Sequence, residues 1–375
     1  MPGNLKGITV VSVEQAVAAP YASMRLASEG ARVIKVERPE GDFARNYDTM
    51  VGGHSAYFLW LNRGKQSVCL DLKSDDDRAL LKRVIAEADV LIQNLKPGTM
   101  AKLGLAVDEL RAEHPRLIAC SISGFGEEGP FADLKAYDLI VQAEAGLCSI
   151  TGTPDGPARV GVSVCDIAAG MSAHAAILQA LFHRERSGEG STIKVSLFDA
   201  LAEWMNVPYL QHVHGGFETQ RSGVNHPSLA PYGAYATRGG GKVIFSVQNQ
   251  REWAAFCEKV LDDTALATDP RFATNMERLD NREALDAIVL ERFAQLEMDD
   301  ALALLKVSGL ACGRLNGIAD LAQHPHLSTT PVKVGGEQVV VILPGAKAKG
   351  ASVPKLSIPE KGQDTEAVTR EFAAR

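Results

Sequence analysis

The first 125 residues alternate short runs of β-favouring residues with helical patterns, and this alternation constrains the fold more than any other feature. A strand, a helix and a second strand in succession are typical of a parallel sheet whose crossover helices cover both faces. We therefore predict an α/β fold with a Rossmann-like parallel sheet that binds its ligand beyond the carboxyl ends of the strands. The expected strands are Ile8–Val13, Val33–Glu37, Ser67–Leu72, Val90–Gln93 and Leu117–Ser123, with helices opening near Pro20 and over about Asp75–Glu87.

A chain of 375 residues is too long for one ordinary core, and typical domain sizes predict two domains. We expect a large domain over residues 1–214 and a smaller α+β domain over residues 242–325. Residues 215–241 are rich in Gly, Pro, Ser and Asn, which is typical of a linker or a lid. Residues 326–375 hold one more β run and a charged helical pattern, and we expect this segment to return to the large domain.

Charge and composition disfavour several classes of partner. The net charge is −7 and no block of Lys and Arg occurs, so a nucleic-acid partner is not expected. We find no apolar run long enough to cross a bilayer and no signal-peptide pattern, so we expect a cytoplasmic protein with no membrane partner. The six cysteines form no C-x-x-C pair, and the close pairs His212/His214 and His324/His326 lack a third ligand, so no metal site is predicted.

Three familiar motifs are incomplete or missing. Gly124–Gly129 spells the dinucleotide-binding fingerprint after a strand, but Pro130 and irregular chain follow where that fingerprint needs a helix. We find neither a phosphate-binding G-x-x-x-x-G-K-[ST] loop nor a G-x-S-x-G elbow. ATP-driven ligation and serine hydrolysis are therefore disfavoured.

Cationic side chains follow three neighbouring strands of the predicted sheet. Lys35 and Arg38 close one strand, Lys73 follows the next, and Lys96 and Lys102 follow a third. One basic residue at a strand end is usually solvated surface, whereas three adjacent basic ends favour a ligand with several anionic groups. The carboxyl edge of the sheet is thus predicted to bind a phosphate-rich ligand.

Asp166 opens a long Ala-rich helical pattern that runs to about Arg186. A carboxylate at a helix N-terminus faces free backbone N–H groups and the positive end of the helix dipole, so we expect it to stay ionised. It is then either a cap or a nucleophile. The adjacent Cys165 has no nearby His in the sequence that would activate it as a nucleophile.

As a set, these segments resemble the family III CoA-transferases, which include formyl-CoA and carnitine CoA-transferases and the related α-methylacyl-CoA racemases. The resemblance spans essentially the whole chain and implies that Asp166 is the catalytic carboxylate, with Tyr137 beside it. It also implies two chains threaded as interlocked rings in a homodimer, with an acyl-CoA as substrate and no permanently bound cofactor. The implied CoA contacts are Arg38, Lys73 and Asn94, and less firmly Leu70, Leu95, Lys102 and Lys135. The matching segments include Gly7–Pro20, Asn62–Ser67, Ala88–Gly98, Ser121–Pro130, Gly161–Gly170 and Gly309–Asp320.

The implied reaction needs only a carboxylate. Asp166 would take the acyl group from a thioester as a mixed anhydride, and the released CoA thiolate would then attack it to form an aspartyl-CoA thioester. An acceptor acid would then run the same two steps in reverse. Two alternatives stay open: racemisation of an α-methylacyl-CoA, and a non-catalytic CoA-binding protein. The racemases carry a His where this chain has Tyr137, and a phenol with a pKa of about 10 is a poor proton shuttle near neutrality.

Departures from the formyl-CoA subgroup narrow the acid. Val17 stands where that subgroup has Gln, Tyr47 stands where it has Trp, and its Gly-rich lid is absent, so formate and oxalate are disfavoured. The run Glu14–Pro20 is similar to that of transferases that act on C4 to C5 dicarboxylates such as succinate, mesaconate and citramalate. We expect Val17 and Tyr47 to line the acid. The distal carboxylate needs a cation or donor, for which the candidates are Arg45, Arg63 and His226.

Overall fold

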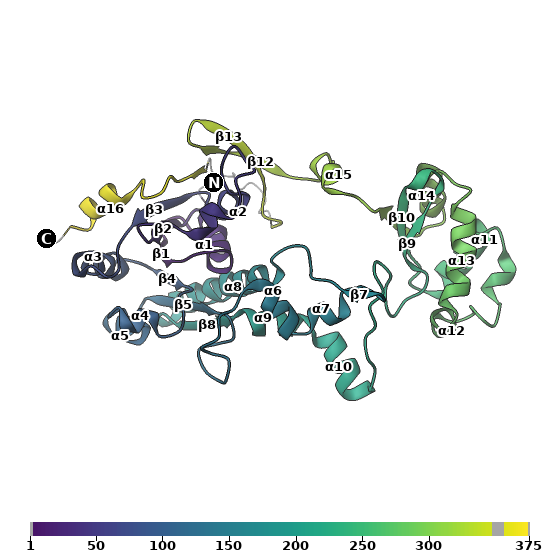
Figure 1. Cartoon of the computed structure of the whole chain (residues 1–375), viewed down its shortest axis with the longest axis horizontal. Helices are drawn as coiled ribbons and strands as arrows, with labels where there is room; N and C mark the ends of the chain where they lie inside the picture. Colours follow the sequence, from purple (N-terminus) through teal and green to yellow (C-terminus); the bar gives the residue numbers. More distant parts are fainter. Residues whose placement is uncertain (1–2, 347–355, 374–375) are drawn as a thin grey trace. The chain divides into compact units, whose positions relative to one another are not determined.

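The computed structural model describes residues 3–346 and 356–373 and divides into two compact units (Figure 1). Unit 1 is made of Met1–Leu147, Arg159–Leu210 and Ser328–Arg375. Unit 2 is made of Cys148–Ala158 and Gln211–Leu327. Two of the four points at which the chain passes from one unit to the other lie within the short helices α7 (Leu147–Ile150) and α10 (Asn206–Gly215).

Unit 1 is built on a six-stranded sheet in the order β3-β2-β1-β4-β5-β8, and every neighbouring pair is parallel. This arrangement confirms the predicted Rossmann-like parallel sheet. The strand order reverses between β1 and β4, and doubly wound sheets bind ligands at such a switch point. The strands are β1 (Thr9–Val13), β2 (Arg32–Glu37), β3 (Lys65–Cys69), β4 (Val90–Gln93), β5 (Ile118–Ser123) and β8 (Thr192–Ser196).

Helices cover both faces of this sheet because side chains alternate between the faces along each strand. Val10 and Ile92 belong to the hydrophobic core that helices α1, α6, α8 and α9 share, whereas Val11 and Leu91 belong to the core that α3, α4, α5 and α16 share. The first group is α1 (Ala18–Ser28), α6 (Asp138–Glu144), α8 (Val164–Ser187) and α9 (Leu197–Trp204). The second group is α3 (Asp75–Ala86), α4 (Thr99–Lys102), α5 (Val107–Glu113) and α16 (Thr365–Glu371).

Helix α8 is the longest helix of unit 1 and ends as its sequence predicts, at Gly188 in the left-handed conformation after a basic last turn. By length and composition alone this helix could span a membrane, so the prediction that no segment reaches that length is wrong. The small residues Ala169, Gly170 and Ala173 are buried in the unit 1 core, so α8 is a core helix. They let α1 approach closely: a Cβ added to Gly170 would lie 2.7 Å from the Ala18 carbonyl oxygen.

The chain returns to unit 1 after Leu327. A second, three-stranded sheet in the order β13-β12-β14 packs Val332 and Val334 against Phe58 of α2. Its strands are β12 (Thr329–Val334), β13 (Glu337–Ile342) and β14 (Ser357–Ile358); α2 spans Ala56–Leu61, and the 3-10 turn η1 spans Phe43–Asn46.

Unit 2 has an antiparallel sheet in the order β11-β10-β9, packed on helices through a core that includes Trp253, Phe256 and Phe293. Part of the predicted 215–241 linker is strand β9, because its small and aromatic residues alternate between a buried and a more exposed face. The strands are β6 (Gly152–Thr153), β7 (Gly156–Pro157), β9 (Tyr232–Ala236), β10 (Lys242–Ser246) and β11 (Ala311–Arg314). The helices are η2 (Arg238–Gly240), α11 (Gln250–Lys259), η3 (Thr264–Ala267), α12 (Asn275–Asp280), α13 (Arg282–Phe293), α14 (Met298–Val307) and α15 (Ile318–Ala322).

Candidate active site

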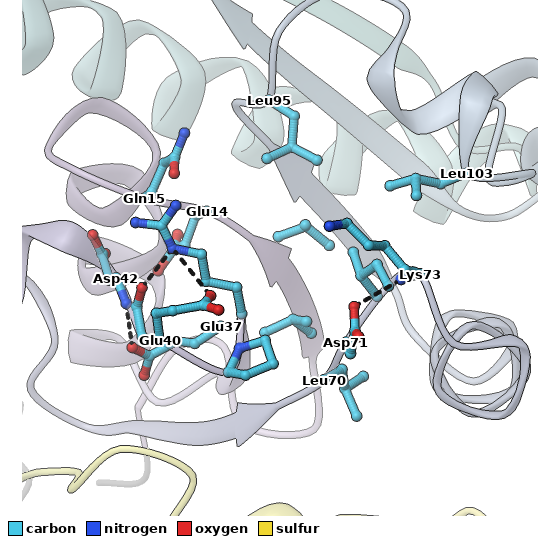
Figure 2. Close-up of a pocket in the computed structure, with 16 residues that line it drawn as sticks. Glu14, Gln15, Glu37, Glu40, Asp42, Leu70, Asp71, Lys73, Leu95 and Leu103 are labelled. Carbon is cyan, nitrogen blue, oxygen red and sulfur yellow. Dashed lines mark hydrogen bonds and ion pairs between the residues drawn. The ribbon is translucent and has the colours of Figure 1, made fainter.

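A pocket of about 450 Å³ lies at the carboxyl ends of β1, β2 and β3 in unit 1 and is also lined by residues that follow β4 (Figure 2). Arg38, Leu70, Lys73 and Leu95 line it, so four of the seven predicted CoA contacts lie together. Leu103 adds a further apolar side chain to the same side of the pocket as Lys73 and Leu70 (Figure 2). The pocket therefore combines two cations and several apolar groups with the carboxylates of Glu14, Glu37, Glu40, Asp42 and Asp71, at the sheet edge where the sequence predicts a phosphate-bearing ligand.

The other three predicted CoA contacts are not among the residues that line this pocket. Lys102, the last residue of α4, and Lys135, in the loop before α6, are both exposed. Asn94 follows β4 directly but turns its side chain to the backbone of Gln15: Nδ2 donates to the Gln15 carbonyl oxygen at 2.8 Å, and Oδ1 accepts from the Gln15 N–H at 3.0 Å.

Beneath the pocket lies a network of buried ion pairs that the sequence did not reveal. Lys35 is fully buried and donates to Asp42 at 2.7 Å, so it is not one of the cations available to a phosphate, contrary to the sequence prediction. Lys65 donates to Glu14 at 2.6 Å, and the Ser12 and Ser23 hydroxyls donate to the other Glu14 oxygen. Each cation lies within a strand and its partner in a loop, so the pairs join the strand ends to the loops above them.

Arg45 completes this network. Its guanidinium donates to both oxygens of Glu37, at 2.8 and 2.7 Å, and stacks 3.7 Å from the centre of the Phe58 ring. Ser67 also donates to Glu37, at 2.6 Å. Arg45 is thus the counter-ion of a buried carboxylate, which does not support the expectation that it binds the substrate.

The pairing determines how these carboxyls titrate. Burial alone would raise the pKa of Glu14, but Lys65 and Lys35 outweigh burial and lower its pKa to about 2. Burial also opposes ionisation of Glu37, yet hydrogen bonds from Arg45 and the charge of Lys35 lower the pKa of Glu37 to about 2. Both side chains are therefore ionised at neutral pH.

Asp166 lies in the first turn of α8, but the amide groups at this helix end are satisfied by a different carboxylate. Asp138 Oδ1 accepts from the N–H of Cys165 at 2.7 Å and from that of Asp166 at 3.3 Å. Asp138 Oδ2 accepts from Gln142 Nε2 at 2.6 Å, and Gln142 Oε1 accepts from the Val160 N–H at 2.9 Å. Asp138, and not Asp166, caps the helix.

This arrangement overturns the prediction that Asp166 is held ionised by the helix end. Burial, and then the charge of Asp138, raise the pKa of Asp166 to about 7. Among the described residues, no Lys, Arg or His forms an ion pair with Asp166. The result is a half-buried carboxyl that gains and loses its proton near neutrality.

The phenol of Tyr47 lies close enough to Asp166 for the charge of that carboxyl to act on it. Burial, and then the charges of Asp42, Asp166 and Tyr137, raise the pKa of Tyr47 to about 12, so its hydroxyl stays protonated and can donate a hydrogen bond. Tyr47 packs edge-on against Tyr57 with ring centres 5.4 Å apart. Tyr137 immediately precedes α6 and is 60% exposed.

The remaining predicted substrate contacts lie in different places. Val17 is buried and immediately precedes α1, whose first residue, Ala18, contacts α8 at Gly170. Arg63 is buried within unit 1 and donates to the Trp60 carbonyl oxygen at 2.9 Å. His226 belongs to unit 2, where it stacks on Tyr232 with ring centres 5.1 Å apart.

The other reactive groups singled out in the sequence have structural roles. Cys165 is buried, and its N–H and Sγ both donate to Asp138. The chain from Gly124 to Ala136 forms no helix, and a Cβ on Gly124 would lie 2.1 Å from that of Ala136, so this glycine allows close packing within the loop. Among the described residues, no three His, Cys, Asp or Glu side chains lie together as a metal site would need.

Comparison with known proteins shows one family over nearly the whole chain. Residues 5–365 match the model of CoA-transferase family III. The chain is 36% identical to the acetyl-CoA:oxalate CoA-transferase of Acetobacter aceti, over 99% of this chain and 96% of that enzyme, and 35% identical to the succinate–glutarate CoA-transferase of Agrobacterium fabrum, over 92% of this chain and 88% of that enzyme. The crystal structure of a CAIB/BAIF family protein from Brucella suis superposes with a TM-score of 0.86 at 34% identity, over 99% of this chain and 100% of that chain. The chain therefore belongs to CoA-transferase family III.

Proposed function

We propose that this CoA-transferase moves CoA from an acyl-CoA, such as succinyl-CoA, to a short-chain dicarboxylic acid through Asp166. The observation that carries the proposal is the state of Asp166, a half-buried carboxyl whose pKa is raised to about 7 by burial and Asp138 and which lies near the phenol of Tyr47. Strongly shifted groups with no structural counter-ion are typical of catalytic sites. The carboxyls of Glu14 and Glu37 carry counter-ions and do not have this character.

The reaction balances without another reagent. The ionised Asp166 attacks the thioester carbonyl, the C–S bond breaks, and CoA leaves as a thiolate while an aspartyl anhydride forms. The thiolate attacks the aspartyl carbonyl and releases the donor acid, leaving Asp166 as a CoA thioester. An acceptor carboxylate then repeats the two steps in reverse order and leaves as its own CoA thioester. With a pKa near 7, a large fraction of Asp166 is ionised at neutral pH and available to attack.

The pocket at the strand ends supports binding of the CoA portion. Arg38 and Lys73 offer positive charge for phosphate groups, while Leu70, Leu95 and Leu103 offer apolar surface. Lys102 and Lys135 are exposed and remain proposed contacts for the outer phosphates.

Dicarboxylic acids are proposed as acceptors because they occur in the names of the relatives. The two relatives described above are named for oxalate and for succinate with glutarate, and all three are dicarboxylic acids. Oxalate therefore stays among the acceptors to be tested, although Val17 and Tyr47 had argued against it. Because Arg45 and Arg63 are engaged within unit 1, we do not assign the distal carboxylate to them, and we propose Tyr47 and Tyr137 as hydrogen-bond donors to the acid.

We further propose a cytoplasmic homodimer. Unit 1 exposes the large apolar side chains of Met171, Phe182 and Trp204, which a second copy would cover. Light scattering of the purified protein should give twice the mass of the chain, and a monomer at micromolar concentration would contradict the dimer.

The test of the proposed function is a panel of acceptors. We would offer the enzyme succinyl-CoA with glutarate, mesaconate, citramalate, oxalate, formate or acetate and follow new CoA thioesters by liquid chromatography. One of the dicarboxylates should exceed acetate and formate in kcat/KM by at least about 100-fold, since a missing charged group leaves its partner unpaired. Equal rates with acetate would contradict the dicarboxylate assignment. A single α-methylacyl-CoA that exchanges its α-hydrogen with D₂O without any acceptor would favour the racemase.

A further inference from the structure

The turn from Glu14 to Val17 touches both parts of the site in unit 1. Glu14 and Gln15 line the strand-end pocket. Three residues after Gln15 the chain enters α1, whose Ala18 carbonyl oxygen meets α8 at Gly170, about one helical turn beyond Asp166. The backbone of this turn therefore connects the pocket wall with the helix that carries the reactive carboxyl.

Three hydrogen bonds from two side chains hold this turn. Asn94 makes both of its bonds to the backbone of Gln15, at 3.0 and 2.8 Å. Asp42 Oδ1 accepts from the N–H of Ala16 at 3.1 Å, and Lys35 fixes the other Asp42 oxygen at 2.7 Å. We call Asn94 and Asp42 the turn clamp.

The conformation that the turn clamp holds is strained. Ala16 has φ of +64°, in the left-handed region, which is unfavourable for an L-residue with a Cβ. Such a conformation persists only where the surroundings impose it. Here it is imposed by the hydrogen bonds to the Gln15 carbonyl oxygen and to the Ala16 N–H, the two polar groups of one peptide bond. Glycine at this position would adopt the same φ without the penalty.

We propose that Asn94 and Asp42 are positioning residues. They hold the strained Gln15–Val17 turn so that the thioester of an acyl-CoA bound in the strand-end pocket is aligned with the Asp166 carboxyl. Asn94 acts through the Gln15 backbone and is not a determinant of CoA affinity. This inference rests on the proposed role of Asp166, because it concerns the alignment of the thioester with that carboxyl. Displacing a reacting group by about 1 Å can cost about 100-fold in rate.

The experiment compares Asn94→Ala and the milder Asn94→Ser with the wild type in three measurements. These are kcat with an acyl-CoA and its acceptor, the Kd for free CoA by calorimetry, and the unfolding temperature. We expect kcat of Asn94→Ala to fall by about 10- to 100-fold while the Kd for CoA changes by less than about 3-fold. The kcat of Asn94→Ser should lie between those of Asn94→Ala and the wild type. This variant allows the same test if Asn94→Ala does not fold.

The decisive arm adds Ala16→Gly to Asn94→Ala. If Asn94 only holds the left-handed turn, glycine restores access to it and should recover part of kcat. A Kd for CoA that weakens by the same factor as kcat/KM, with kcat unchanged, would overturn the proposal and make Asn94 a CoA contact. Failure of Ala16→Gly to recover any activity would overturn it as well. A wild type that transfers CoA but carries nothing on Asp166 would instead refute the proposed function.

Discussion

Unit 1 holds two groups of carboxylates in opposite electrostatic states. Glu14 and Glu37, beneath the pocket, are surrounded by Lys35, Lys65 and Arg45, and their pKa values fall to about 2 because these cations outweigh the cost of burial. At Asp166, by contrast, burial and the negative charge of Asp138 act in the same direction, and together they raise its pKa to about 7. The comparison shows that cations neutralise the buried carboxylates that hold the loops of unit 1. Among the described residues, no cation forms an ion pair with the carboxyl that we propose as nucleophile.

The largest effect should come from Asp166→Asn. The amide has nearly the same shape but cannot form the anhydride, so kcat should fall by at least about 10⁴-fold. The Kd for CoA should stay within about 3-fold of the wild type, because the pocket that we assign to CoA lies at the strand ends. Asp133→Asn, an exposed carboxylate in the loop before α6, serves as the matched control and should retain activity.

The same variant sharpens the comparison through pH. A carboxyl whose pKa is raised in the folded state binds its proton there more tightly than in the unfolded chain, so it lowers stability as pH rises from about 4 to about 7. Asp166→Asn should therefore unfold at a higher temperature than wild type at pH 8 and at a similar temperature at pH 4. A stability loss at pH 8 would mean that the ionised Asp166 has a counter-ion in the native protein.

The next largest effect concerns the network beneath the pocket. Glu14→Gln leaves Lys65 buried without its counter-ion and should lower the free energy of unfolding at pH 7 by about 3–5 kcal/mol, measured by urea titration. Adding Lys65→Met should recover part of that loss, since it removes the unpaired charge. Glu87→Gln, at an exposed position, is the control. A change below about 1 kcal/mol for Glu14→Gln would show that the pair does not carry the stability ascribed to it.

That network should also titrate in the opposite direction from Asp166. Because the folded-state pKa of Glu14 is about 2 and its ordinary value is 4.5, its contribution is complete above pH 4.5 and is lost as pH falls through about 2. The two carboxylate groups thus predict opposite slopes of stability with pH, one below pH 4.5 and one between about pH 4 and 7.

A smaller effect is expected at the pocket cations. Arg38→Ala and Lys73→Ala should each raise the KM for acyl-CoA by about 10-fold with little change in kcat, and the effect should shrink with added salt. Lys82→Ala, an exposed lysine on α3 that does not line the pocket, should leave KM unchanged. Equal KM values for all three variants would place the phosphates elsewhere.

The smallest effect is expected from Asp138→Asn. Removing this charge leaves an oxygen for the α8 amides but lowers the pKa of Asp166, so the acid limb of kcat/KM should move to lower pH by up to about one unit. If the acid limb does not move, the pH dependence of kcat/KM does not arise from the interaction between Asp138 and Asp166. Asp133→Asn again provides the matched control.

The sequence predicts most of the elements of this fold but little of its electrostatics. The strands of the large sheet and the course of α8 follow from local periodicity and end signals, which act over a few residues. Lys35 and Arg38 look equivalent in the sequence, yet one is buried against Asp42 and the other lines the pocket. Whether such a cation is buried or lines the pocket depends on the alternation of side chains along the strand and on the partner residues that the sheet brings beside it.

The cap of α8 was missed for the same reason. Asp138 lies far from Asp166 in the sequence, and only the packing of α6 beside α8 brings its carboxylate to the helix end. An Asp at the start of a helical pattern favours a cap, and a second Asp after a Tyr gives no local sign that it takes that role instead. The distinction between a compensated and an uncompensated carboxyl is therefore a property of the tertiary structure.

The most direct test of the central claim is to trap the covalent state of Asp166. The enzyme would be mixed with an acyl-CoA without acceptor, quenched with hydroxylamine, digested and examined by mass spectrometry. The account predicts an aspartyl hydroxamate at Asp166, which forms in the wild type and disappears in Asp166→Asn. Full turnover with an unmodified Asp166, or a trapped adduct at another residue such as Cys165, would contradict it.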